Sequence, residues 1–175
     1  MPRQARGEIL DPAEIQLVHC VQRCVRRAFL CGSDPLTGKS FEHRRQWMRS
    51  RLEFLASIFA IDCLTYTLMS NHVHLILRSR PDVVAAWSDQ EVARRWLRLF
   101  PRRREPDGSP AEPNEAEVAS LVNQPAVLAE RRRRLSDISW WMKCSAENIA
   151  RRANAEDECT GPLLGRTLQA SGPAR

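Results

Sequence analysis

Two apolar segments, Ala60 to Leu68 and His72 to Arg78, flank the short turn Met69-Ser70-Asn71, and this arrangement constrains the fold more than any other feature. The first segment is rich in apolar and β-branched residues, and the second continues as an apolar run, which predicts two strands. Strands joined by so short a turn must pair antiparallel. The sequence therefore predicts a β-hairpin, and with it an antiparallel sheet, near the middle of the chain.

The second strand of this hairpin begins with the sequence His-Val-His. Side chains two residues apart on a strand face the same way, about 6.6 Å apart along it, so His72 and His74 should project from one face. The alternate residues should point into a core, namely Val73, Leu75 and Leu77. Two neighbouring imidazoles can bind a divalent metal ion. Most histidines are ordinary surface or core residues, however, so the motif by itself only suggests a metal site.

Periodicity and turn signals assign the remaining elements. Alternation predicts a strand from Gln16 to Phe29, and apolar residues at helical spacing predict a helix from Ser40 to Phe59. Ser88, three residues before Glu91, has the pattern of a capping box at the start of a helix that ends at Leu99. Three further helices are expected over residues 115–122, 125–134 and 136–153.

This order of elements predicts an α+β domain over residues 15–161. Residues 1–14 are polar and contain two prolines, so they are interpreted as an N-terminal arm. Residues 101–114 contain four prolines and are interpreted as a loop or insertion within the domain. Residues 162–175 show no periodicity and form an irregular tail.

Composition limits the class of protein and its partners. A chain of 175 residues with 43% hydrophobic and 27% charged residues is typical of one soluble globular domain. Lys and Arg outnumber Asp and Glu by 27 to 21, which gives a net charge of +6. No segment approaches the roughly 20 apolar residues of a membrane span. No apolar signal-peptide core follows Met1, so we expect a cytoplasmic protein with reduced cysteines.

Almost all of the positive charge is arginine, which makes bidentate contacts with phosphate and so favours a polyanionic partner. Trp140 and Trp141 are candidates for stacking on bases, although at helical spacing such residues are more often part of a core. A charged helix face is, in the same way, more often simply solvated. The candidate nucleic-acid-binding residues are Arg23, Arg26, Arg27, Arg44, Arg45, Arg131 and Arg132.

Three stretches resemble the HUH-endonuclease family, which is named for its His-hydrophobic-His motif. More narrowly, they resemble the single-tyrosine transposases of bacterial insertion sequences and their REP-associated relatives. MSNHVHLIL is similar to the most recognisable segment of that family, VQRCVRRAF to its opening strand, and Leu135 to Gly161 to its late helix and the following turn. The resemblance implies a ferredoxin-like antiparallel sheet with helices packed on it.

The same resemblance implies a chemistry, the nicking and joining of single-stranded DNA in DNA transposition. In the family, the motif histidines bind Mg²⁺ or Mn²⁺, and a tyrosine of the late helix attacks the scissile phosphate. His72 and His74 would then bind the metal ion, and Asn154 is the nearest match to a further polar ligand. The implied partner is single-stranded or hairpin DNA, and the implied assembly is a monomer or a homodimer.

The chain departs from the family at the nucleophile. Its single tyrosine, Tyr66, lies on the first strand of the hairpin, where we expect it to face a helix or the core. Ile149 and Ala150 stand near the expected tyrosine position, and neither Cys144 nor Ser145 is a chemically ordinary replacement. We therefore expect cleavage to be impaired or absent. Two alternatives stay open, a non-catalytic nucleic-acid-binding domain and a metal-dependent hydrolase that uses water.

The tail after Gly161 is a second departure. The segment GPLLGRTLQ can be encoded by codons from which the loss of one base yields GRFWDGRFK, a sequence similar to the family's continuation. We therefore hypothesise that a single-base insertion shifted the reading frame after Gly161. The nucleotide sequence of the locus tests this hypothesis, which fails if the alternate frame does not continue as a family-like open reading frame.

Overall fold

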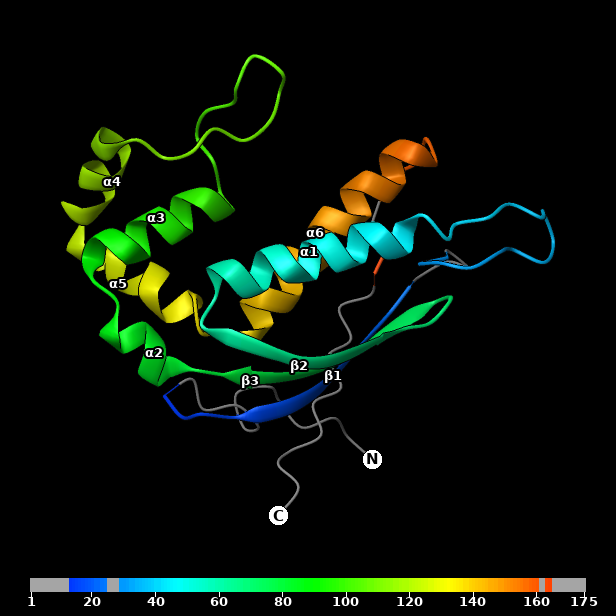
Figure 1. Ribbon diagram of the computed structural model, residues 1–175, viewed down its shortest axis with the longest axis horizontal. Coiled ribbons are helices and arrows are strands. Elements are labelled where there is room, and N and C mark those ends of the chain that lie inside the picture. The colour runs from blue at the N-terminus through cyan, green and yellow to red at the C-terminus, as the bar shows by residue number, and fades with distance from the viewer. Residues whose placement is uncertain (1–12, 25–28, 161–162, 165–175) are drawn as a thin grey trace.

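A computed structural model describes residues 13–24, 29–160 and 163–164 of the chain and shows one antiparallel sheet with helices packed against it (Figure 1). The strands lie in the order β1 (Leu17–Arg23), β3 (His72–Ser79) and β2 (Ile61–Leu68). The central strand β3 pairs antiparallel with both neighbours. The prediction of an α+β fold with an antiparallel sheet is therefore confirmed, and the hairpin forms where the sequence predicted it.

The alternation of β3 separates a core face from a second face. Val73, Leu75 and Leu77 are 1%, 1% and 0% exposed, as predicted, because they point toward the helices. The register places three residues of β1 on the same face, since Val18, Cys20 and Gln22 pair with Leu77, Leu75 and Val73. All three residues of β1 are buried.

Helices α1 (Arg44–Ile58) and α6 (Ile138–Glu156) pack together above this core face (Figure 1). The apolar stripe of α1 is buried, including Met48, Leu52 and Leu55. α6 begins at Ile138, two residues later than predicted, because the side chain of Asp137 accepts hydrogen bonds from the backbone N–H groups of Ser139 and Trp140.

Four shorter helices follow the sheet. They are α2 (Pro81–Ala86), α3 (Asp89–Leu99), α4 (Glu115–Val122) and α5 (Pro125–Arg134). α2 was not predicted, although a proline at the first helical position is a recognised start signal. Ser88 caps α3 as expected, but the carboxylate of Glu91 pairs with Arg95. Residues 101–114 contain no helix or strand and form a loop that projects from the domain (Figure 1).

The predicted strand from Gln16 to Phe29 was too long. β1 ends at Arg23, which lies opposite His72, the first residue of β3. The next residue, Cys24, donates from its N–H to the carbonyl of Asn71 in the turn before β3 and makes an isolated bridge to Leu164. Residues 25–28 lie outside the described residues, and Phe29 is not in a strand.

Leu163 and Leu164 are the part of the tail that the structure describes. Both are buried in the core, and Leu164 lies antiparallel to Cys24, next to the free edge of β1. None of the described helices is long and apolar enough to cross a membrane.

A histidine cluster as the candidate functional site

Strand β3 holds His72 and His74 on the face of the sheet opposite the helices. Residues paired across strands share a face, and Arg23 and Val21 of β1 pair with His72 and His74. His19 pairs with Ile76 and therefore lies on the same face. We call this surface of β1, β3 and β2 the histidine face.

Three of the four histidines of the chain meet on the histidine face. Nε2 of His19 lies 2.9 Å from Nδ1 of His74, and the two rings are inclined by 18° with their centroids 5.2 Å apart. The ring of His72 meets that of His74 edge-on, at a centroid distance of 5.0 Å. The two motif histidines are thus neighbours, as predicted, and His19 of the adjacent strand joins them.

The turn residue Asn71 orients the ring of His72. Nδ1 of His72 lies 2.6 Å from Oδ1 of Asn71. An amide oxygen only accepts hydrogen bonds, so Nδ1 carries the proton and Nε2 keeps its lone pair. Partial burial, followed by the nearby charges of His74 and Arg23, lowers the pKa of His72 from its ordinary value. The ring is therefore neutral near pH 7, the form that can bind a metal ion.

This predicts that the His72 ring titrates below the ordinary value of 6.5. The midpoint can be measured by following the ring resonances in an NMR titration. Arg23→Gln removes one of the positive neighbours and should move the midpoint upward. A midpoint at or above 6.5 in the unmodified protein would contradict this description of the site.

The residues present fit a divalent ion held by two imidazoles. Nδ1 of each motif histidine is engaged by a neighbour, Asn71 for His72 and His19 for His74, and Nε2 of each ring lies outside these contacts. Among the described residues, no group of three or more His, Cys, Asp and Glu side chains is arranged to hold a metal ion. An ion on His72 and His74 would therefore take its other ligands from water or from a phosphate.

The structure does not bring Asn154 together with the histidines. It lies on α6, which packs with α1 on the opposite side of the sheet (Figure 1). Its Oδ1 accepts a hydrogen bond from Sγ of Cys159, at 3.5 Å. Ile149 and Ala150, near the expected tyrosine position, lie on the same helix, and Ile149 is completely buried in the core.

The other candidate nucleophiles also lie away from the histidine face. Tyr66 pairs with Leu75 and so lies on the helix side of β2, where it is 39% exposed near the edge of the sheet. It therefore faces the helices, as expected, but is not a core residue. Ser145 is buried with its hydroxyl 4.0 Å from Sδ of Met48. Burial raises the pKa of the Cys144 thiol to about 11 and keeps it protonated.

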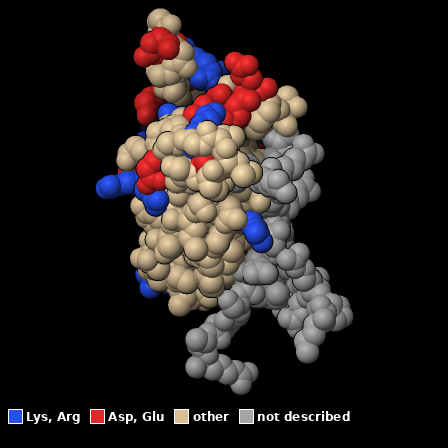
Figure 2. Space-filling view, turned by 90° about the vertical axis from the view of Figure 1, so that its right-hand side faces the viewer, with Lys and Arg blue, Asp and Glu red and all other residues tan. Residues whose placement is uncertain are grey.

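The predicted nucleic-acid-binding arginines differ in what they contact. Arg23 is exposed on the histidine face, and Arg45 is exposed but pairs with Glu42 at 2.6 Å. Arg26 and Arg27 lie outside the described residues. Figure 2 shows basic side chains lying among acidic ones on the described part of one face of the molecule. The general basic character of the chain therefore does not by itself locate a DNA-binding surface.

Arg132 and Arg131 of α5 take part in helix packing. Arg132 donates to the backbone carbonyls of Val84 and Trp87 and pairs with Asp89, which ties α5 to α2 and the start of α3. The guanidinium of Arg131 stacks over the ring of Trp96 at 4.4 Å. These partners engage both terminal nitrogens of Arg132 within the fold, which weighs against the predicted phosphate contact.

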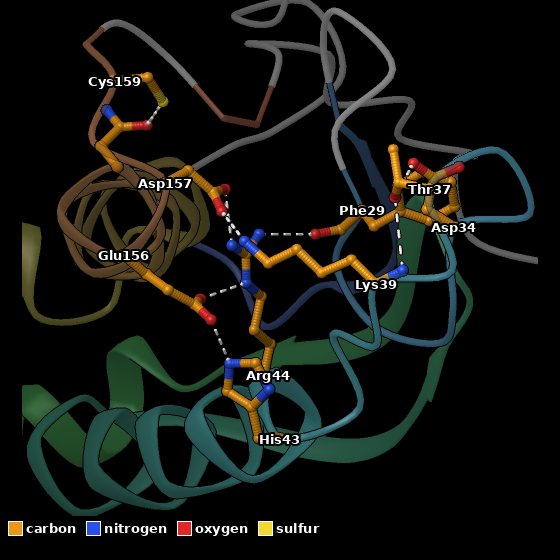
Figure 3. A network of polar contacts seen from close by, with 10 residues as sticks. Phe29, Asp34, Thr37, Lys39, His43, Arg44, Glu156, Asp157 and Cys159 are labelled. Atoms are coloured by element: carbon orange, nitrogen blue, oxygen red, sulfur yellow. Dashed lines mark hydrogen bonds and ion pairs between the residues drawn. The ribbon is translucent and has the colours of Figure 1, made fainter.

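Arg44 is the most buried of the candidate arginines that the structure describes. It is only 1% exposed, and it donates to Glu156 at 2.8 Å, to Asp157 at 2.6 Å and to the carbonyl of Phe29 at 3.0 Å (Figure 3). Its guanidinium is thus enclosed by the N-terminal end of α1 and the C-terminal end of α6. This burial and these three partners weigh against the predicted phosphate contact at Arg44.

The two tryptophans of α6 differ in their exposure to solvent. Trp141 is completely buried and belongs to the core, as its helical spacing suggested. Trp140 is partly exposed, with Arg134 and Lys143 lying 4.3 Å and 4.7 Å from its ring centroid. These cations already occupy positions over the ring, so Trp140 is not an open stacking platform for a base.

The sequence interpretation missed His19. Its signal was present, because strand alternation places His19 on the face opposite Val18 and Cys20. Finding it required the strand order, which sets β1 directly beside β3. Neither the protein-family models nor the curated proteins compared with this chain give a match. The functional conclusion therefore depends on the geometry of the histidine face.

Proposed function

We propose that the histidine face binds a divalent metal ion, Mg²⁺ or Mn²⁺, together with single-stranded or hairpin DNA. The domain would be a relative of the HUH single-tyrosine transposases that lacks their nucleophile. One observation carries the proposal, the pair of imidazoles on the central strand with Nδ1 of each engaged by a neighbour. This arrangement fixes the rings and leaves Nε2 of each facing away from those contacts, as metal-binding histidines require.

The topology supports this family relationship. A helix connects β1 to β2, and β3 inserts between them, which is the arrangement of the first three strands of a ferredoxin-like fold. The complete fold adds a fourth strand next to the first. The antiparallel bridge between Cys24 and Leu164 lies at that edge, in the part of the chain that follows the last helix.

The exposed guanidinium of Arg23 supports a phosphate-binding role. Arg23 lies directly across from His72 on the same face, so a DNA backbone that reaches the histidines also passes this arginine. Bound metal would neutralise charge on the non-bridging oxygens of that phosphate. His72 and His74 would hold the ion, and Arg23 would orient the backbone through charge-assisted hydrogen bonds.

The position of the candidate nucleophiles favours binding without covalent cleavage. Tyr66 projects from the helix side of the sheet, and Cys144 and Ser145 are buried. This observation favours the second candidate function, a non-catalytic domain that recognises hairpin or single-stranded DNA. A hydrolase needs a general base, and Asp62, the acidic strand residue of the histidine face, is paired with Arg78 at 2.7 Å.

A single assay separates these functions. The protein is incubated with Mn²⁺ and a labelled DNA hairpin with single-stranded flanks, and covalent adduct, free cleavage and binding are measured together. We expect binding without an adduct. A covalent adduct would overturn the loss of the nucleophile, and cleavage without an adduct would favour the hydrolase. If the DNA is not bound in any condition, the proposed function fails.

Arg23→Gln should weaken binding of the hairpin about 5- to 10-fold and reduce the slope of log K against log salt concentration by about 1, because one phosphate contact is lost. Fluorescence anisotropy at several salt concentrations measures both quantities. Arg45→Gln is the matched control, since Arg45 lies on α1, on the helix side of the sheet, and pairs with Glu42. Equal losses for the two variants would show that Arg23 has no special role.

A further inference from the structure

His19 and His74 form the closest contact between strands on the histidine face. Their ring nitrogens are 2.9 Å apart, and the rings are inclined by only 18°. A distance of 2.9 Å is that of a hydrogen bond, so one of the two nitrogens donates a proton and the other accepts it. The direction of this bond decides which nitrogen of His74 carries the proton in the neutral ring.

The two directions have opposite consequences for metal binding. If Nε2 of His19 donates, Nδ1 of His74 is the acceptor and the proton of the neutral His74 ring sits on Nε2, which then cannot bind an ion. If Nδ1 of His74 donates, its Nε2 keeps a lone pair. His72 already shows the second pattern, because Oδ1 of Asn71 can only accept from its Nδ1.

We infer that His19 is a positioning residue whose Nε2 accepts a hydrogen bond from Nδ1–H of His74 and leaves Nε2 of His74 available to a divalent metal ion. This inference rests on the proposed function. His19 would orient the ring of His74, just as Asn71 orients the ring of His72. Each metal-binding ring would then have its own orienting partner. The two partners come from different places, one from the turn before β3 and one from the neighbouring strand.

A role as third metal ligand fits the contacts less well. Nε2 of His19 is directed at Nδ1 of His74, inside hydrogen-bond distance, so it is already engaged. Among the described residues, no three His, Cys, Asp or Glu side chains, His19 included, are arranged to hold one ion. The small inclination of 18° between the two rings, with their nitrogens 2.9 Å apart, also favours a role in fixing the orientation of His74.

Two substitutions separate positioning from ligation. His19→Phe keeps a flat ring beside His74 but has no acceptor, whereas His19→Gln offers an amide oxygen that can accept from Nδ1–H. In the metal-free protein, ¹⁵N–¹H correlation spectra report which nitrogen of His74 carries the proton. We expect Nδ1–H in the wild type and in His19→Gln, and loss of that tautomer in His19→Phe.

The affinity for Mn²⁺, measured by titration calorimetry, is the second readout. His19→Phe should weaken binding about 10-fold, and His19→Gln should bind within about threefold of the wild type. Finding Nε2–H on His74 in the wild type would overturn the inference. Equal weakening in both variants with an unchanged His74 tautomer would also overturn it, in favour of a third ligand. A wild-type protein that binds no Mn²⁺ refutes the proposed function itself, and this result is read before any variant is made.

Discussion

His72→Ala should lower the affinity of the protein for Mn²⁺ by about 100-fold. Removing a residue that only orients a ligand costs about 10- to 100-fold in metal affinity, and removal of a ligand itself costs at least as much. His72 is one of two imidazoles that would hold the ion, and its Nδ1 is already engaged by Asn71. Titration calorimetry of the wild type and the variant measures the change.

His43→Ala is the matched control for this prediction. His43 precedes α1 and its Nε2 lies 2.7 Å from the carboxylate of Glu156, so it has no contact with the histidine face. Its loss should leave Mn²⁺ affinity within about twofold of the wild type. If His43→Ala and His72→Ala weaken Mn²⁺ equally, or if neither does, the ion does not bind at the motif. Binding of hairpin DNA in the presence of a chelator should survive His72→Ala, because Arg23 remains.

Arg44→Met should reduce the free energy of unfolding by about 2 kcal/mol, because the buried guanidinium makes three hydrogen bonds that a thioether cannot replace. Arg44 is 1% exposed and donates to Glu156, Asp157 and the carbonyl of Phe29 (Figure 3). The substitution keeps most of the side-chain length, so the loss reports the polar contacts. Urea unfolding followed by circular dichroism measures it.

The neighbouring Arg45 provides the control. Its side chain is 48% exposed and pairs with Glu42, so Arg45→Met should change the free energy of unfolding by less than about 1 kcal/mol. If Arg44→Met were as mild as Arg45→Met, the cluster between α1 and α6 would contribute nothing to stability. A second variant, Asp157→Asn, should lose less than Arg44→Met, because Glu156 still pairs with Arg44.

The parts of the fold that local signals determine were predicted well. The hairpin of β2 and β3 follows from two apolar segments around a short turn, and α4 and α5 have the predicted bounds. The errors occur where a residue far away in the sequence determines where an element ends. β1 stops at Arg23 because β3 starts opposite it, and nothing within the first segment alone indicates that end.

The residues of the candidate site also differ in whether nearby sequence predicts their position. His72 and His74 share a short motif, so their common face was predictable, whereas His19 is 55 residues away from His74 in sequence and needed the strand order. The surroundings of the arginines depend on still more distant segments. Arg44 and Arg132 are engaged by acidic residues and carbonyls from other segments, 112 residues away for Glu156 and 48 for Val84. Local charge does not reveal such partners.

Paramagnetic broadening by Mn²⁺ shows where on the protein the ion binds. A substoichiometric amount of Mn²⁺ is added to ¹⁵N-labelled protein, first alone and then with the DNA hairpin. The ring resonances of His72 and His74 should broaden first, followed by those of His19, and the phosphorus resonances of the hairpin should broaden more with the protein than with the same amount of Mn²⁺ alone. If the resonances of the histidine rings stay sharp while those of acidic side chains elsewhere broaden, the ion does not bind at the histidine face, and the proposed metal site is refuted.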